Sequence, residues 1–345
     1  MYSKYLLKFY TLTAYRIAKP WYPEADELRN ENQMLDFTAM GILLVLCASW
    51  GLQQVAIKVA IQGVSPIFQS SIRSMGATIL IWIWMKVRRE PIFERDGTLW
   101  WGIAAGLLFA GEFVLIYWGL EYTNASRAVI FLYMSPFVVA LGAQLFIPGE
   151  HLRIIQVVGL CCAFVGIVVA FSESLAFHTH RMLIGDSMLA VAAILWGATT
   201  VLIKASPLGK IKPSKTLLYQ LSVSAVVLPL GSLAKGEAGI VGLTPLIVGS
   251  LVYQTVWVAF VTYLAWFWLI RNYPPSRLAS FTFLTPLFGV LAGGLLLNEP
   301  ITRGLLLALV LVGTGIYLVN RPVAHRGGLE RVSVHPSSTD RGDTF

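Results

Sequence analysis

The sequence predicts an all-α polytopic membrane protein with ten transmembrane helices, arranged as two inverted five-helix repeats. Composition is the first reason: 56% of the residues are hydrophobic, 13% are charged, and the mean hydropathy is +0.69. The second is that apolar residues gather in runs of about 20, which at about 1.5 Å per residue can cross a bilayer. The third is a repeat, because Ser126-Arg127 and Ser276-Arg277 are each followed by a proline ten positions after the serine.

Ten apolar runs follow one another along the chain, separated by short loops. They cover residues 39–59, 65–86, 98–120, 124–147, 153–173, 183–204, 213–233, 243–270, 275–297 and 301–320. Residues 39–173 form the first predicted repeat and residues 183–320 the second. The polar residues 1–38 are expected to be a cytoplasmic tail, and residues 321–345 a disordered cytoplasmic tail. The start codon is expected at Met1, Met34 or Met40, and the later starts would shorten or remove the first tail.

The fourth run of each repeat carries a proline near its middle, Pro136 in the first and Pro286 in the second. Proline removes a backbone donor and bends a helix, and a membrane tolerates this mainly where protein or water meets the freed carbonyl. A glutamate follows each run, Glu150 in the first repeat and Glu299 in the second. The sequence therefore predicts a kinked helix that lines a cavity in each half.

The first helix of each repeat carries a matching Trp-Gly pair, which begins at Trp50 in one repeat and at Trp196 in the other. A lysine lies eight residues beyond each tryptophan. Because each repeat has five helices, an odd number, the second repeat must cross the membrane upside down relative to the first. This is the inverted-repeat architecture of secondary transporters, which bind substrate between the halves near the midplane.

The basic residues predict the orientation. Most of the 26 Lys and Arg residues fall in loops that are cytoplasmic if the N-terminus is cytoplasmic, whereas a few, among them Arg127, fall in the outer loops. This bias places both termini in the cytoplasm. The net charge of +8 is therefore attributed to membrane orientation, and no nucleic acid is expected to bind. The three cysteines lie inside apolar runs and the five histidines outside them, so no metal site, disulfide or cofactor is predicted.

These repeated features resemble a known family. Residues 122–136 read YTNASRAVIFLYMSP and lead to Gly149 and Glu150, and each repeat opens with the Trp-Gly pair. Together they resemble the drug/metabolite transporter superfamily (DMT), in its ten-helix EamA-type metabolite exporter branch, over residues 40–320. The second repeat departs from the pattern in its loop, where Asn298 replaces the glycine.

The resemblance implies a secondary membrane transporter that exports small polar metabolites, such as amino acids or related compounds, by alternating access through a central cavity. The alternative within the same class is efflux of drugs or toxic compounds. No GxxxxGK[ST] signature for ATP occurs, so a gradient must supply the energy. The expected partners are a small-molecule substrate and the lipid bilayer, the expected state is a monomer or homodimer, and the expected location is the plasma (inner) membrane of a bacterium.

Glu112 is the sharpest site candidate, because an acid inside a span costs about 2.5 to 3.5 kcal/mol on insertion scales and should therefore face the interior. Arg73 lies at a similar depth in the second run, since each is eight residues from the outer end of its run. The functional interpretation is an acid that responds to protons or binds substrate, with a basic partner. The alternative is a buried ion pair that only fixes helix packing.

Polar and aromatic side chains within the spans are further candidates for the substrate path. They are Trp50, Gln54, Tyr133, Trp196, Thr200, Tyr253 and Trp257. An aromatic ring could stack on a substrate, and an amide or hydroxyl could hydrogen-bond it. The alternative is that each side chain packs against its neighbouring helix.

Two other classes remain as alternatives. An intramembrane enzyme would need a nucleophile with its base, a metal set or two acids at working distance, whereas Glu112 and Asp186, the main acids in the spans, are predicted at different depths. A membrane sensor would need a domain to relay its signal, and the sequence suggests none. A transporter is therefore the favoured class.

Overall fold

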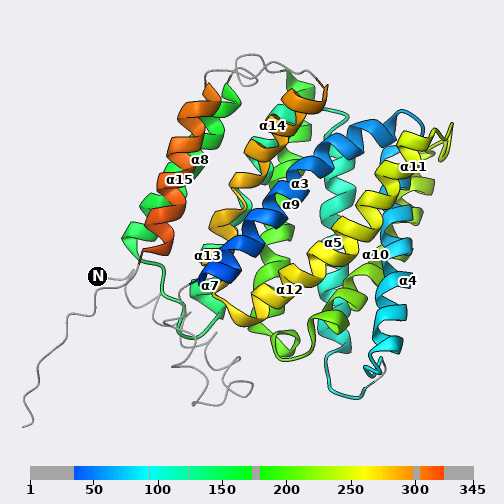
Figure 1. The fold of residues 1–345 in the computed structure, drawn as a ribbon, viewed down its shortest axis with the longest axis horizontal. Coiled ribbons are helices and arrows are strands. Elements are labelled where there is room, and N and C mark those ends of the chain that lie inside the picture. Colours follow the sequence, from blue (N-terminus) through cyan, green and yellow to red (C-terminus); the bar gives the residue numbers. More distant parts are fainter. Residues whose placement is uncertain (1–34, 93, 124, 173–178, 298–303, 322–345) are drawn as a thin grey trace, which may run out of the picture.

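The computed structural model of the protein describes residues 35–92, 94–123, 125–172, 179–297 and 304–321, and these residues form a bundle of helices (Figure 1). The predicted tails beyond this range, with Met1 and Met34, and the loop with Glu299 lie outside the described residues. The helices are α3 (Phe37–Ile61), α4 (Pro66–Val87), α5 (Leu99–Gly119), α6 (Ala125–Leu132), α7 (Ser135–Phe146), α8 (Ile154–Ala170), α9 (His180–Ala205), η3 (Pro207–Gly209), α10 (Pro213–Lys235), α11 (Pro245–Val252), η4 (Tyr253–Thr262), α12 (Tyr263–Asn272), α13 (Pro275–Phe281), α14 (Leu284–Leu297) and α15 (Gly304–Asn320).

Seven helical stretches of the described chain are long and apolar enough to cross a membrane. They are α3, α5, α9 and α10 and the stretches formed by α6 with α7, by α11 through α12, and by α13 with α14. The apolar helices α8 and α15 are shorter, with 17 residues each. The remaining helix, α4, has 22 residues and includes polar side chains such as Gln69 and Arg73. The chain is therefore a polytopic α-helical membrane protein.

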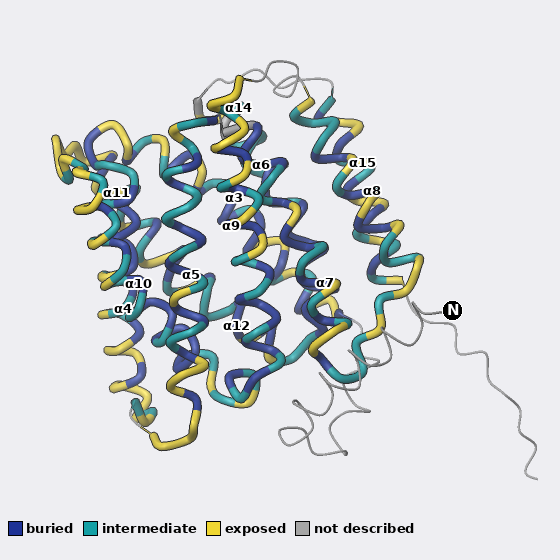
Figure 2. Tube along the Cα trace, turned by 180° about the vertical axis from the view of Figure 1, so that it is seen from behind, coloured by how far each residue is buried: buried dark blue, intermediate teal, exposed yellow. Residues whose placement is uncertain are grey.

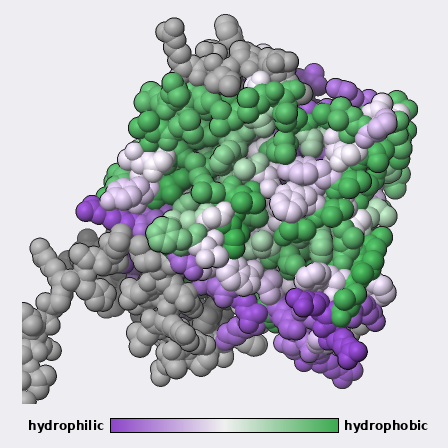
Figure 3. All heavy atoms as spheres, viewed as in Figure 1, coloured by the Kyte–Doolittle hydropathy of each residue, from purple (hydrophilic) through white to green (hydrophobic). Residues whose placement is uncertain are grey.

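The surface of the bundle suits lipid. Buried residues face the interior and exposed residues line the outside of the helices (Figure 2). Large apolar side chains such as Val226, Leu246 and Val310 are exposed there. Hydrophobic side chains cover most of the face shown in Figure 3, and hydrophilic ones gather along its lower edge. An apolar belt of this kind is what a bilayer requires of the helices that it surrounds.

Two of the helical stretches are interrupted shortly before a proline. Two residues separate α6 from α7 next to Pro136, and two residues separate α13 from α14 next to Pro286. A proline has no N–H, so the carbonyl four residues before it loses its helical donor. At the second break the Thr282 carbonyl instead accepts the N–H of Thr285 at 2.9 Å. The chain between Tyr253 and Thr262 is also irregular, because it forms a π-helix in the middle of the α11–α12 stretch.

Helices from the two halves of the chain pack against each other in a reciprocal pattern. The first helix of the first half, α3, packs against η4 and α14, and the first helix of the second half, α9, packs against α5 and α7. The contact of α5 with α10 is matched by the contact of η4 with α4. Two further contacts join equivalent helices of the two halves, α4 with α10 and α8 with α15. Gly159 lies at the last of these contacts, where an added Cβ would be 2.7 Å from the carbonyl oxygen of Gly315. Small residues there allow two helix backbones to approach closely.

Matching glycines occupy matching contacts in the two halves. A Cβ added to Gly51 on α3 would lie 2.7 Å from the Phe288 Cβ and from the Gly289 nitrogen on α14. A Cβ added to Gly197 on α9 would lie 2.6 Å from the Val138 Cβ on α7. Each glycine follows the tryptophan of its Trp-Gly pair, and Val138 and Phe288 each lie twelve residues after the serine of their Ser-Arg pair. The sequence repeat is thus reproduced by these close contacts.

Candidate functional site

The most unusual polar feature inside the bundle is a pair of buried charged side chains. Arg73 on α4 is 1% exposed, and Glu112 on α5 is 6% exposed. The Arg73 guanidinium carbon lies 4.2 Å from the centre of the Phe113 ring, and its Nη2 is 3.4 Å from the Ser70 hydroxyl. Arg73 is also close enough to Glu112 for the two charges to attract. The structure therefore brings together the two residues that the sequence placed at the same depth.

No hydrogen bond joins Arg73 to Glu112. Arg73 Nε and Nη1, Glu112 Oε2 and the Tyr117 hydroxyl are all buried without a hydrogen-bond partner. A buried polar group costs free energy unless it is paired, and a buried charge costs much more. The site thus contains buried hydrogen-bond donors and acceptors without partners. The Arg73 guanidinium could bind an anionic group, and the Glu112 carboxylate could bind a cationic one.

A chain of aromatic rings leads from this pair to Trp50. The Phe113 ring, which lies under Arg73, is 4.9 Å from the Phe109 ring, and Phe109 is 5.8 Å from Tyr263 on α12. Tyr263 is in turn 6.2 Å from Trp50 on α3. These edge-to-face contacts between α3, α5 and α12 give one flank of the charged pair an apolar wall.

Trp50 also belongs to a polar cluster between α3 and the π-helix. Its indole N–H donates to the Thr262 hydroxyl at 2.9 Å. Nearby, the Tyr253 hydroxyl donates to the Ser49 carbonyl at 2.9 Å, and the Trp257 indole N–H donates to the Ser49 hydroxyl at 2.9 Å. Three of the predicted path residues therefore meet at the contact between the first and eighth predicted spans. The polar ends of all three side chains are used in contacts between these helices.

The remaining predicted path residues do not join this cluster. Tyr133 contacts Trp196, with ring centres 5.8 Å apart, and Phe283, at 6.4 Å. Thr200 donates to the Trp196 carbonyl of its own helix at 3.3 Å. Gln54 is exposed, and its side chain lies beside Gly289 of α14. The nine predicted path residues thus divide into the charged pair, the Trp50 cluster, the Tyr133–Trp196 contact and two residues that belong to none of these.

Sequence reasoning missed one buried ion pair. It assigned Arg127 to an outer loop, but Arg127 lies in α6, is 4% exposed and forms an ion pair with Asp186 on α9. Asp186 also accepts the Thr123 hydroxyl at 2.8 Å. The correction has a simple cause: the predicted run at 124–147 already includes Arg127, and the Asp186 carboxylate on α9 supplies the partner that allows the guanidinium to be buried. The sequence signal was that both charged residues lie inside predicted apolar runs.

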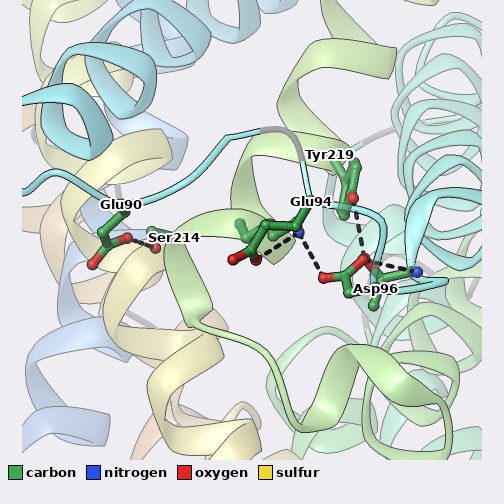
Figure 4. A network of polar contacts seen from close by, with 7 residues as sticks. Glu90, Glu94, Asp96, Ser214 and Tyr219 are labelled. Carbon is green, nitrogen blue, oxygen red and sulfur yellow. Dashed lines mark hydrogen bonds and ion pairs between the residues drawn. The ribbon is translucent and has the colours of Figure 1, made fainter.

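One end of the bundle carries several ionic and hydrogen-bonded contacts between the two halves. We call it the basic face; α4, α9 and α12 end there, and α10 and α13 begin there (Figure 1). Lys215 on α10 is 2.6 Å from Asp96 and 3.3 Å from Glu94, both in the loop after α4 (Figure 4). Burial acts to raise the pKa of Asp96, but hydrogen bonds from Lys215 and Thr98 outweigh it and lower the pKa to about 2.

The loop glutamate of the first repeat lies at the same face. Glu150 accepts a hydrogen bond from the Ser276 hydroxyl, at the start of α13, at 2.7 Å. Burial raises the pKa of Glu150 above its ordinary value, while the Ser276 hydroxyl and the charges of Lys204 and Arg277 act in the opposite direction. Two landmarks of the sequence repeat, a loop glutamate and the serine of a Ser-Arg pair, are therefore direct partners across the two halves.

Among the residues that the structure describes, no group of three or more His, Cys, Asp or Glu side chains could hold a metal ion. The described part of the chain therefore offers the charged pair and its aromatic flank as the candidate site. Its buried atoms without partners include hydrogen-bond donors, on Arg73, and an acceptor, on Glu112.

Comparison with known proteins agrees with a transporter. Residues 38–172 and 183–321 each match the EamA-like transporter family. A protein of Escherichia coli (strain K12) named "Probable amino-acid metabolite efflux pump" is 26% identical over 287 residues, which cover 81% of this chain and 93% of that protein. The "Uncharacterized transporter YvbV" of Bacillus subtilis (strain 168) is 26% identical over 279 residues, which cover 81% of this chain and 90% of that protein.

A solved crystal structure, described only as that of a protein, shares the fold. Its TM-score is 0.69 at 15% sequence identity, and the match covers 80% of this chain and 94% of the other. The two family matches extend over more than half of the chain. The resemblance to the EamA branch of the drug/metabolite transporter superfamily is thereby confirmed, and the protein is a multi-pass membrane transporter. The chain belongs to the EamA-like transporter family.

Proposed function

We propose that the protein is a secondary transporter that exports small polar metabolites, such as amino acids or related compounds, by alternating access. The observation that carries the proposal is the buried pair of Arg73 and Glu112, several of whose polar atoms are buried without a hydrogen-bond partner. An amino acid presents a carboxylate and an ammonium group a few ångströms apart. Arg73 would bind the carboxylate and Glu112 the ammonium, and the aromatic flank would contact the side chain.

The proposed architecture is ten spans in two inverted repeats. It is supported by the reciprocal helix contacts and by the matched close approaches at Gly51 and Gly197. The two shortest proposed spans, α8 and α15, each have 17 residues, about 25 Å at 1.5 Å per residue, which is at the lower limit for a span. The helix α4 is long enough, and its polar residues Gln69, Ser70 and Arg73 are buried, so its lipid-facing side remains apolar.

We place the basic face in the cytoplasm of a bacterial cell, with both termini on that side of the plasma membrane. The support is the excess of Lys and Arg in the loops of this face, which is the usual cytoplasmic signal. Under this orientation, substrate enters from the basic face and leaves at the opposite one.

Flux measurements on purified protein in proteoliposomes would test the proposal. Vesicles preloaded with a panel of unlabelled amino acids are mixed with trace labelled substrate, and exchange is followed with time. Glu112→Gln should raise KM for a transported amino acid about 10-fold or more, because a hydrogen bond to a charged group is worth about 1.5 to 3 kcal/mol. Glu94→Gln is the matched control, since Glu94 is an acid on the basic face whose side chain is 50% exposed.

The outcomes separate the parts of the proposal. If Glu112→Gln exchanges every transported compound as wild type does, the assigned role of the charged pair is wrong. If no amino acid exchanges but lipophilic cations do, the alternative of drug or toxic-compound efflux takes its place. The aromatic chain from Trp50 to Phe113 is the feature that would favour such compounds.

A further inference from the structure

The short helix α13 occupies the middle of the basic side of the bundle. All seven of its residues are buried. It packs against α3 and α7 from the first half and against α9, α12 and α15 from the second. Its counterpart in the first half, α6, is less enclosed, because Val129, Phe131 and Leu132 are only partly buried. The basic side of the bundle is therefore filled by a helix that both halves surround.

This helix is separated from the rest of its span by a break. Residues 282–283 connect α13 to α14, and Pro286 keeps the ordinary helical hydrogen bond from forming across that connection. The Thr282 hydroxyl donates back to the Ala279 carbonyl at 2.7 Å, so part of the bonding at the end of α13 is local to it. A short helix bounded by such a break can move as a unit while α14 keeps its own hydrogen bonds.

At least three side-chain hydrogen bonds join α13 to its surroundings, and one of them comes from Cys47. At its start, the Ser276 hydroxyl donates to Glu150 in the loop after α7, at 2.7 Å. In its middle, the Asn320 amide at the end of α15 donates to the Ser280 hydroxyl at 3.1 Å. The first of these crosses between the two halves of the chain, so it must change if the halves separate at the basic face.

We infer that α13 is the gate on the basic face, and that it swings about residues 282–283 when the hydrogen bond between Ser276 and Glu150 opens. The inference rests on the proposed alternating access. In the closed state the hydrogen bond between Ser276, the serine of the second Ser-Arg pair, and Glu150, the loop glutamate of the first repeat, holds the gate in place. Glu150 and Ser276 are thus positioning residues for the transport cycle.

The chain contains its own reporter for this motion. Cys47 on α3 is fully buried, and its thiol donates to the Phe281 carbonyl, the last of α13, at 3.3 Å. Cys47 therefore lies directly against the end of the gate and becomes reachable only when α13 moves. The other two cysteines, Cys161 and Cys162, lie on α8, away from this contact.

The test is the labelling rate of Cys47 in the full chain carrying Cys161→Ser and Cys162→Ser. A membrane-impermeant maleimide is added to vesicles of either orientation, and the labelled fraction is followed with time. Ser276→Ala should label about tenfold faster than the parent when the reagent faces the basic side, because closing the gate no longer gains a hydrogen bond to a carboxylate. Ser276→Thr keeps the hydroxyl and should restore a rate near that of the parent.

Ser214→Ala is the matched control. Ser214 also donates to a glutamate of the other half at the basic face, Glu90, but it lies on α10 and not on α13 (Figure 4). It should leave the rate unchanged. Asn320→Leu is a second way to loosen the gate and should also raise the rate.

Each result decides something. The gate would be overturned if neither Ser276→Ala nor Asn320→Leu raised the labelling rate of Cys47 with maleimide on either side of the membrane. It would also be overturned if Ser214→Ala raised that rate equally. An increase confined to reagent on the opposite side would keep the gate and overturn the proposed orientation. Because labelling needs no substrate, failure of the proposed substrate class would leave the outcome readable.

Discussion

The contact between α3 and α14 leaves no room for a methyl group at Gly51. A Cβ there would lie 2.7 Å from the Gly289 nitrogen and from the Phe288 Cβ, whereas ordinary contacts begin near 3.4 Å. Backbone atoms cannot rotate away, so Gly51→Ala must push the two helices apart by about 0.7 Å, the difference between 3.4 and 2.7 Å. Overpacking of this kind costs about 1 to 3 kcal/mol, and we expect about 2 kcal/mol here. The assay is the apparent melting temperature of the purified protein in detergent, which should fall by several degrees.

Gly41→Ala provides the control on the same helix, because an added Cβ at Gly41 meets no atom within 4 Å. It should stay within about 0.5 kcal/mol of wild type. Gly197→Ala should resemble Gly51→Ala, since its Cβ would lie 2.6 Å from the Val138 Cβ in the matching contact. If Gly51→Ala and Gly41→Ala melt together, the close approach of α3 to α14 is not as described.

Two further predictions concern charged contacts. Asp186→Asn should lower the free energy of unfolding by about 3 kcal/mol or more, because it leaves Arg127 buried beside a neutral partner. Thermal melting should show this loss, and the double variant Arg127→Leu with Asp186→Leu should recover part of it. Asp96→Asn should cost about 1 kcal/mol at pH 7, a value reduced by solvent because Asp96 is 26% exposed. Since its pKa is lowered to about 2, the stabilisation is complete above the ordinary aspartate pKa near 4 and is lost only as pH falls toward about 2. The difference in melting temperature between Asp96→Asn and wild type should therefore be constant from about pH 5 to 8, and a difference that shrinks across that range would count against the Lys215 contact.

Much of the helical framework follows from the sequence, because apolar run length and proline positions are local signals. The run at 65–86 corresponds to α4 (Pro66–Val87), and the run at 213–233 corresponds to α10 (Pro213–Lys235), since a proline suits the first turn of each helix. Caps shift other ends. The helix α9 begins at His180, three residues before the predicted run, because the Thr179 hydroxyl accepts the Met182 N–H.

The candidate site was less predictable. Depth along the spans correctly suggested that Arg73 and Glu112 could meet, but it could not show that both would keep unpaired atoms. Trp50 and Gln54 were both predicted to line the substrate path, yet Trp50 is buried against the π-helix and Gln54 is exposed. Which helix lies opposite a residue depends on packing between distant parts of the chain, and one sequence holds little information about it.

The π-helix bears on how the two halves came to differ in length. Three more residues separate Ser126 from Ser276 than separate Pro66 from Pro213, so the second half has gained residues between its second and fourth helices. The wider turns of residues 253–262 lie in that interval. Extra residues inserted into an ordinary α-helix would rotate everything beyond them by about 100° each, whereas wider turns absorb them locally. A span that arose by duplication can thereby accept extra residues within the membrane. Tyr253 and Trp257, which hydrogen-bond Ser49, lie in this widened stretch.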